Sequence, residues 1–201
     1  GFYLGGHDSN VMIYDSENPS TIHYSKSERH FGVKHHWANL GWIKDFINKY
    51  NFKPDVIVYS DGGRNKLGKT PNSDILYQKQ MDKNITSRIN DELETSVENI
   101  WILDHHFSHI LSCWPVIKTE DVKYGVAIDG SGDWTDRVTM VKNPYDVVKN
   151  NLPLDKSNLL RLKDFHPSGV LTVLGRRMGL YGSALDMAGK IMGAYAYGKI
   201  D

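Results

Sequence analysis

The stretch that decides the fold lies at residues 2–14 and has the sequence FYLGGHDSNVMIY. Two short apolar runs, Phe2–Leu4 and Val11–Tyr14, flank a polar segment that contains two adjacent glycines. Apolar runs separated by a glycine-rich polar turn are typical of a β-hairpin. Thr21–Ser25 is a candidate for the next strand. We therefore expect the chain to begin with antiparallel strands.

Further along, apolar strands alternate with segments of helical periodicity. Val56–Tyr59 and Ile100–Leu103 are continuous apolar runs, as in strands that are buried on both faces. Apolar residues at helical spacing predict a helix over His36–Asn51, and a second helix is predicted over His105–Trp114. This alternation predicts an α/β domain with a mixed β-sheet and flanking helices.

A second glycine-rich hairpin is predicted in the second half of the chain. Its strands are Tyr124–Ile128 and Val138–Val141, and Asp129–Trp134 forms the turn between them. Two more helices are predicted, over Val170–Leu180 and Ala184–Met192.

Two segments lack a clear pattern. Thr70–Asn90 is polar, and we expect an exposed insertion with some helix there. Asn143–Asp164 is expected to be rich in loops.

The composition limits the classes of partner. The 201 residues carry 24 Lys+Arg and 24 Asp+Glu, which gives no general attraction to nucleic acid or to an anionic membrane, although a local basic patch is left open. Cys113 is the one cysteine, so these residues form no disulfide among themselves, and a cytoplasmic location is expected. No apolar run approaches the roughly 20 residues that span a bilayer. Neither end has terminal character, and we expect the chain to be incomplete.

A histidine pair is the first candidate site. On a helix, residues four positions apart share a face, so His105 and His109 can bind one metal ion while His106 points about 100° away. Asp104 could cap this helix or orient a histidine. Two ligands leave the coordination sphere open, which suits a catalytic site, and a third ligand must come from elsewhere. The alternative is a polar helix start without a metal.

The second hairpin turn is a candidate phosphate site. Glycines at Gly130 and Gly132 allow close approach of the backbone to a ligand, and successive N–H groups can form an anion nest. Asp129, at the end of the strand, could bind a metal or orient a phosphate through one. The segment lacks the Gly-Lys-Ser/Thr ending of a Walker loop. The alternative is an ordinary hairpin turn, because Asp-Gly is a favoured turn pair.

Four more residues are candidates for catalysis. His7 and Asp8 lie in the first hairpin turn and could act as a base or a metal partner, or could be ordinary polar turn residues. Lys34 belongs to the charged stretch Glu28–His35, for which a solvated loop is the simpler expectation. Lys190 follows Gly189 between small residues and could bind a phosphate oxygen as a point charge, or the glycine could simply allow close helix packing.

In this order, the segments resemble the O-carbamoyltransferase family of nodulation and antibiotic-tailoring enzymes. The likeness runs from Leu4 to Gly198, and the double-histidine motif followed by Asp-Gly-x-Gly is its most specific part. The matching segments are His7–Ser9, Glu28–Phe31, Lys34–His35, Asp104–His109, Ile128–Trp134 and Gly189–Gly193.

The resemblance implies a fold and a set of ligands. It implies an actin/Hsp70-like (ASKHA) ATPase-type domain, similar to the tRNA threonylcarbamoyl transferases. Residues 1–201 would be its N-terminal portion, with the downstream lobe and a YrdC-like domain outside this chain. Fe(II) or another divalent metal would be held by His105 and His109, with a further Asp ligand beyond Asp201. Mg and ATP, or carbamoyl adenylate, would lie at Asp129, Gly130, Ser131, Gly132 and Gly189.

The resemblance also implies an activity. ATP and carbamoyl phosphate would give carbamoyl-AMP, whose carbamoyl group passes to the hydroxyl of a sugar, natural product or nucleoside. His7 or Asp8 would take the hydroxyl proton, and Lys34 and Lys190 would assist. The alternatives are a nucleotide- and metal-binding regulatory module without turnover, a tRNA threonylcarbamoyl-type transferase, and an α/β domain whose histidine cluster is incidental. The sequence leaves open the acceptor, the metal and the oligomeric state, including a homodimer.

Overall fold

A computed structural model gives the fold. It describes residues 1–5, 8–61, 77–79, 83–114, 121–129, 137–150, 152, 157–162, 164 and 167–195. The strands are β1 (Phe2–Leu4), β2 (Asn10–Tyr14), β3 (Ile22–Lys26), β4 (Val56–Asp61), β5 (Tyr77–Lys79), β6 (Asn99–Leu103), β7 (Tyr124–Ile128), β8 (Val138–Lys142) and β9 (Leu159–Leu162). The helices are α1 (Ser27–Phe31), α2 (Leu40–Lys49), α3 (Lys83–Leu93), α4 (His105–Ser112), α5 (Pro144–Lys149), α6 (Pro167–Arg177) and α7 (Ala184–Tyr195).

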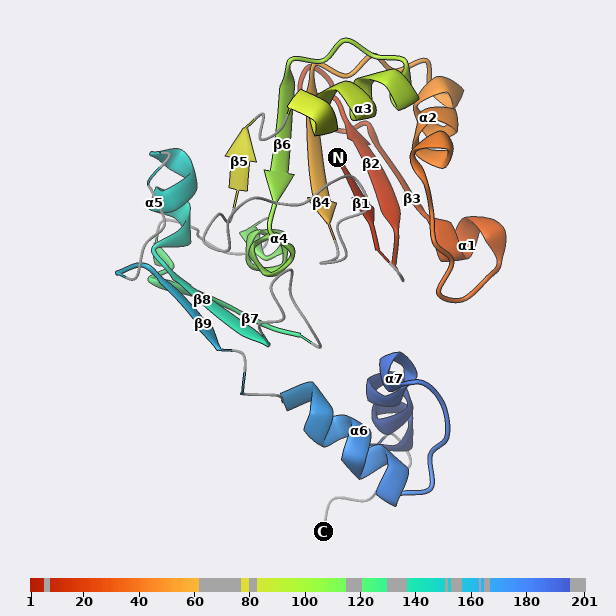
Figure 1. The fold of residues 1–201 in the computed structure, drawn as a ribbon, viewed down its shortest axis with the longest axis vertical. Coiled ribbons are helices and arrows are strands. Elements are labelled where there is room, and N and C mark those ends of the chain that lie inside the picture. The colour runs from red at the N-terminus through yellow and green to blue at the C-terminus, as the bar shows by residue number, and fades with distance from the viewer. Residues whose placement is uncertain are drawn as a thin grey trace.

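The described strands form two sheets, as Figure 1 shows. The larger sheet has the order β3-β2-β1-β4-β6-β5, in which β1, β4 and β6 are parallel and β2 and β5 run antiparallel to their neighbours. The smaller sheet is an antiparallel meander in the order β7-β8-β9. The predicted opening hairpin is confirmed, with Phe2 paired to Val11. The predicted α/β class with a mixed sheet and flanking helices is also confirmed.

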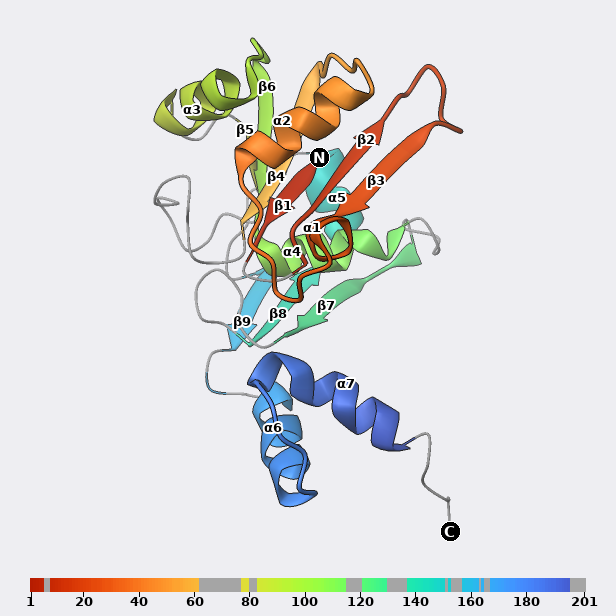
Figure 2. The same cartoon turned by 90° about the vertical axis from the view of Figure 1, so that its right-hand side faces the viewer.

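Helices α2 and α3 cover one face of the larger sheet (Figures 1 and 2). The side chain of Asn39 accepts a hydrogen bond of 3.0 Å from the N–H of Trp42, so α2 begins at Leu40, later than predicted. Ile43 on α2 and Ile89 on α3 are fully buried in the core beneath them. Burial of each such side chain contributes about 1.5–3 kcal/mol.

The insertion predicted at Thr70–Asn90 does contain helix, but at residues 83–90 it is not an exposed excursion. They form most of α3, whose apolar residues at Ile85, Ile89 and Leu93 face the core. Because all the residues between these three are polar, the segment as a whole showed no clear apolar pattern in the sequence. Residues 77–79 form the edge strand β5, and the rest of the predicted insertion lies outside the described residues.

Helix α4 lies between the two sheets (Figures 1 and 2). It follows β6 after a single residue and packs on β7 of the smaller sheet, where Phe107 and Ile110 join Ala127 and Val141 in a second core. A Cβ on Gly125 would lie 2.3 Å from Cγ2 of Ile110, so only glycine allows this approach.

The predicted loop-rich segment Asn143–Asp164 contains regular structure. Pro144 occupies the first turn of α5, where the missing N–H costs nothing, and Val147 on this helix is fully buried. Leu159–Leu162 adds the third strand of the smaller sheet. The expectation of a loop was therefore wrong for these two elements.

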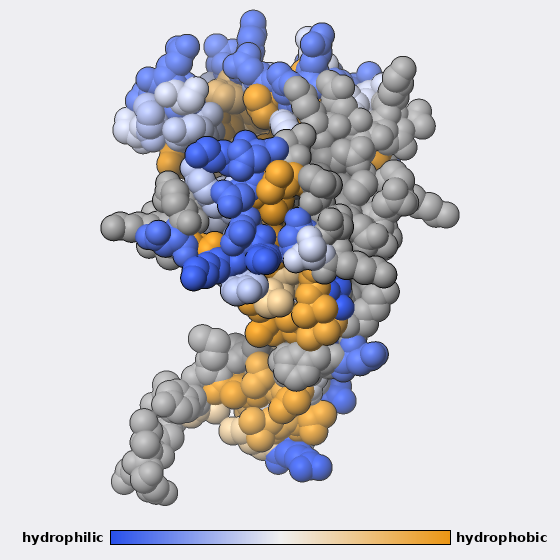
Figure 3. Space-filling view, turned by 90° about the vertical axis from the view of Figure 1, so that its left-hand side faces the viewer, coloured by the Kyte–Doolittle hydropathy of each residue, from blue (hydrophilic) through white to orange (hydrophobic). Residues whose placement is uncertain are grey.

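The last two described helices confirm the prediction for Val170–Leu180 and Ala184–Met192 with shifted ends. Hydrophobic side chains are exposed on α6 and on the outer face of the smaller sheet (Figure 3). They include Val170, Val173 and Leu174 on α6, and Tyr124, Val126 and Ile128 on β7.

Within the described part of the chain, no helix combines the length and the apolar character needed to cross a bilayer.

Candidate metal centre

Helix α4 presents two histidines on one face. Its start is fixed by Asp104, whose carboxylate accepts a hydrogen bond of 2.9 Å from the N–H of Phe107. From that start, His105 and His109 are one turn apart, and their Nε2 atoms lie 3.3 Å from each other. His106 points elsewhere and is fully buried. The predicted arrangement of the three histidines and the capping role of Asp104 are confirmed.

Asp129 completes a cluster of three potential ligands. It directly follows β7, and its Oδ2 lies 2.7 Å from Nε2 of His105 and 3.3 Å from Nε2 of His109. The strand alternation that turns Gly125 and Ala127 toward α4 also turns Asp129 toward it. Asp129 was expected to bind a metal or to orient a phosphate through one, and its carboxylate lies at the histidine pair.

The three atoms fit one face of a metal coordination sphere. With metal–nitrogen bonds of about 2.0–2.1 Å, two ligands at a tetrahedral angle lie about 3.3 Å apart. Two edges of the triangle have this length, and the 2.7 Å edge between His105 and Asp129 has to widen by about half an ångström. Two imidazoles and a carboxylate suit Fe(II) and also Zn(II). The donor set therefore indicates a divalent transition-metal ion but does not indicate which reaction the site performs.

The site is buried on one side and open on the other. His105 has only 11% of its side chain exposed, whereas His109 has 53% and Asp129 has 37%. The hydrogen bond to the Asp129 carboxylate raises the pKa of the His109 imidazole, although partial burial opposes this. A cation bound here would take the place of the proton shared between imidazole and carboxylate. The remaining coordination positions of that cation would face solvent.

The larger sheet reaches the same site from the other side. The ring centroid of Tyr3, on β1, lies 5.7 Å from that of His105. The hydroxyl of Ser60, on β4, lies 3.4 Å from that of Ser108 on α4. The carboxyl ends of parallel strands in open α/β sheets are the usual place for ligands. The metal candidate therefore lies where β1, β4 and β6 end.

Most of the predicted phosphate and base residues cannot be placed against this centre. His7, Gly130, Ser131 and Gly132 lie outside the described residues. Asp8 is described and has a positive φ of 59°. Its carboxylate forms an ion pair with Lys26.

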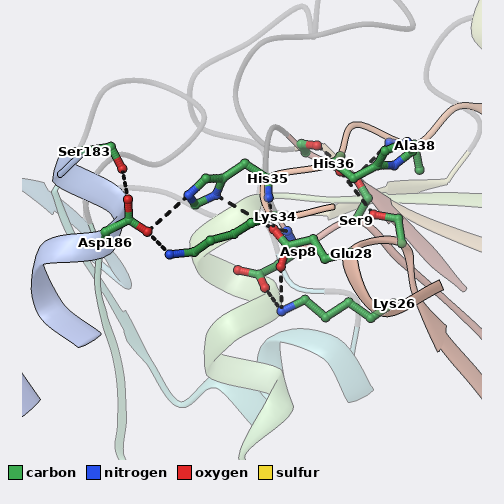
Figure 4. A network of polar contacts seen from close by, with 12 residues as sticks. Asp8, Ser9, Lys26, Glu28, Lys34, His35, His36, Ala38, Ser183 and Asp186 are labelled. Atoms are coloured by element: carbon green, nitrogen blue, oxygen red, sulfur yellow. Dashed lines mark hydrogen bonds and ion pairs between the residues drawn. The ribbon is translucent and has the colours of Figure 1, made fainter. Parts of the chain in front are cut away.

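The charged stretch Glu28–His35 was expected to be a solvated loop; residues 29–34 are exposed, but Glu28–Phe31 are helical, so the loop is wrong for that part. The stretch begins within α1, which ends at Gly32 with φ 67°, and then folds back onto Glu28. The Glu28 carboxylate accepts the N–H of His35 at 2.8 Å and that of Asp8 at 3.4 Å (Figure 4). Burial would raise the pKa of Glu28, but these N–H groups and the charge of Lys26 together lower it.

The described contacts of the two candidate lysines join the loop before α2 to α7, and α7 to the α6–α7 connection. Lys34 contacts the carboxylate of Asp186, which also accepts a hydrogen bond of 2.7 Å from the hydroxyl of Ser183 (Figure 4). Lys190 lies one turn beyond Asp186 and donates to the backbone carbonyl of Tyr181. Gly189 precedes it within α7. These contacts belong to the loop before α2 and to the α6–α7 connection.

Arg161 was not among the predicted site residues, and its guanidinium lies against Asp104 at the start of α4. The available signal was only a single arginine between leucines in Leu159–Leu162, and strand alternation by itself would have turned that arginine to solvent.

No model of a known protein family, no curated protein and no solved structure matches this chain.

Proposed function

We propose that His105, His109 and Asp129 bind one divalent transition-metal ion, and that this centre serves an ATP-dependent O-carbamoyltransferase. The observation that carries the metal site is the triangle of ligand atoms, with edges of 2.7, 3.3 and 3.3 Å. The partial exposure of His109 and Asp129 supports a catalytic rather than a structural metal, because a structural site is closed by four protein ligands.

The arrangement of strands supports an actin-like domain. Each sheet begins with a hairpin, β1–β2 or β7–β8, and each turn has a glycine-rich sequence. Paired turns of this kind hold nucleotide phosphates in actin-like ATPases, although a fold alone does not establish a function. On this proposal, residues 1–201 are the N-terminal portion of the domain, and the downstream lobe and a YrdC-like domain lie outside them.

The proposed reaction transfers a carbamoyl group from carbamoyl-AMP, made from ATP and carbamoyl phosphate. The acceptor hydroxyl oxygen forms a bond to the carbamoyl carbon, the bond from that carbon to the phosphate oxygen breaks, and AMP leaves. A bound divalent cation would supply polarisation of the carbamoyl and phosphate oxygens. The hydroxyl proton must pass to a base, for which His7 and Asp8 are the candidates.

The chain's own residues set conditions on this scheme. Asp8 is paired with Lys26, so that ion pair must open before the carboxylate can accept the proton. Lys34 is likewise paired with Asp186 and must leave it to reach a developing negative charge. Nε2 of His105 and Oδ2 of Asp129 lie 2.7 Å apart and would both be metal ligands, so any hydrogen bond between them would be lost when the cation binds.

The first experiment measures bound metal and turnover together. The protein in its longest form is loaded with Fe(II) under reducing conditions, and bound metal is measured by elemental analysis beside the variant H105A/H109A. H30A, on an exposed histidine of α1, is the control. About one equivalent in the parent and in H30A, with little in the folded double variant, is expected. A parent without metal would contradict the proposed centre.

Turnover separates the remaining alternatives. Release of AMP that depends on carbamoyl phosphate and is lost in H105A/H109A is the expected result. Metal binding without that release, in a protein with both later domains, would favour a regulatory module. A transferase that acts on tRNA is the less supported alternative, because equal numbers of acidic and basic residues give no general attraction to RNA. Salt-sensitive tRNA binding would reverse that ranking.

A further inference from the structure

Three consecutive side chains at the start of α4 contact three different strands or strand ends of the smaller sheet. Asp104 receives Nη1 and Nη2 of Arg161, from β9, each at 3.1 Å. His105 lies 2.7 Å from Asp129, at the end of β7. Nδ1 of His106 lies 2.8 Å from the hydroxyl oxygen of Thr139, on β8. The first turn of the helix is therefore tied to the whole width of this sheet.

The sheet presents these partners as one row. Thr139 pairs laterally with Ala127 on β7 and with Arg161 on β9. All three residues turn toward α4, and Thr139 is fully buried while the Arg161 side chain is only 10% exposed. Polar groups that are buried in this way need hydrogen-bond partners. Here the partners are supplied by the N-terminal turn of α4.

The contact between Arg161 and Asp104 is well suited to fixing a helix. The Asp104 side chain is 1% exposed, and its second oxygen caps α4 through the N–H of Phe107. Removal of one partner of such a buried ion pair leaves an uncompensated charge, so the pair resists separation. The planar guanidinium brings two N–H donors to one carboxylate, which a lysine ammonium cannot reproduce.

We propose that Arg161 and Thr139 are positioning residues of the metal centre. Through Asp104 and His106 they set the rotation and depth of α4, and so the separation of His105 and His109 from Asp129. Neither residue provides a metal ligand. The inference rests on the proposed metal binding. It follows because metal coordination tolerates displacements of the three ligand atoms of only a fraction of an ångström. Outer-shell partners of metal ligands typically contribute a factor of about 10–100 to metal affinity.

The test measures Co(II) affinity and the visible Co(II) absorption band in the full chain, because that band reports coordination geometry. The main variant is R161M/D104N, which removes both charges together and keeps an amide oxygen to cap α4. T139V removes the hydroxyl beside His106, and T139S retains it. R88M is the matched control, since Arg88 is exposed and pairs with Glu92 one turn away on α3.

Co(II) affinity is expected to fall about tenfold or more in R161M/D104N and in T139V, with an altered absorption band. T139S and R88M should keep the affinity and the band of the parent. A merely structural role would lower the unfolding midpoint but leave affinity and band unchanged in the folded protein, and that result would overturn the positioning role. If R161M/D104N does not fold, unchanged affinity in T139V overturns the role in the same way.

The outcomes also separate this inference from the proposed function. A parent chain that binds no Co(II) overturns the metal centre and the positioning role with it. A parent that binds Co(II) with the same affinity as R161M/D104N and T139V overturns the positioning role alone. Circular dichroism of each variant before titration shows which samples are folded.

Discussion

Gly125→Ala tests how closely α4 has to pack on β7. A Cβ at this position would lie 2.3 Å from Cγ2 of Ile110 and 3.4 Å from its Cβ and Cγ1. Since the first distance is well below van der Waals contact, the Ile110 side chain must leave its rotamer or α4 and β7 must move apart. Overpacking of this kind typically lowers the free energy of unfolding by about 1–3 kcal/mol. The metal ligands straddle the same interface, so Co(II) affinity should fall in parallel.

A second substitution provides the rescue. Ile110→Ala alone should cost about 2–5 kcal/mol, because this side chain is 6% exposed in the core. It also removes Cγ2, which leaves the new methyl at residue 125 with an ordinary contact to the Cβ of residue 110. The double variant should therefore cost less than the sum of the single variants, with a coupling of about 0.5–3 kcal/mol.

The assay is urea unfolding of the parent, both single variants and the double variant, followed by Co(II) titration of each. Gly193→Ala serves as the control, because a Cβ there meets nothing within 4 Å and alanine favours a helix such as α7. Single effects that add to within about 0.5 kcal/mol would refute the steric argument. Unchanged Co(II) affinity in a destabilised Gly125→Ala would show that the ligand triangle does not depend on this packing.

Three further predictions follow from the described contacts. Ile89→Ala should lower the free energy of unfolding by about 2–5 kcal/mol, since Ile89 is fully buried, whereas Ile22→Ala at an exposed position should have little effect; equal effects in urea unfolding would remove α3 from the core. The lowered pKa of Glu28 contributes stability that is present above the ordinary glutamate pKa of about 4.3 and is lost as the pH falls through the lowered value. Glu28→Gln should therefore flatten the loss of stability on acidification, and a steeper loss in unfolding measured across that range would contradict the assignment. Asp129→Asn should weaken Fe(II) binding while Asp146→Asn, on α5, should not, as measured by equilibrium dialysis.

Local patterns predicted the elements that local sequence determines. The glycine-rich turn between two apolar runs predicted the first hairpin, and the spacing of His105 and His109 predicted a shared face. These predictions succeed because strand and helix periodicities are properties of neighbouring residues. The position of the third ligand could not be predicted in this way, because the approach of Asp129 to the histidines depends on the packing of α4 on β7. Strand alternation could have indicated its face, since it stands two positions beyond Ala127.

The smaller sheet shows why alternation alone was insufficient. In β9, apolar Leu160 and Leu162 suggest an inward face, with Arg161 turned to solvent. The structure has the opposite orientation, with Leu160 46% exposed and the Arg161 side chain only 10% exposed. Its partner Asp104 lies 57 residues earlier in the chain. A pairing over that separation is a tertiary contact that the pattern of either segment does not contain.

The candidate residues divide into two groups that differ in what they require. The metal group needs only a widening of the contact between His105 and Asp129 by about half an ångström, because its other two edges already match coordination geometry. The second group begins in ion pairs, Asp8 with Lys26 and Lys34 with Asp186. A carboxylate that is paired with an ammonium group becomes a base only when that pair opens. The three ligand atoms therefore already lie close to coordination geometry, whereas the proposed carbamoyl transfer through Asp8 or Lys34 would require a substrate that separates these ion pairs.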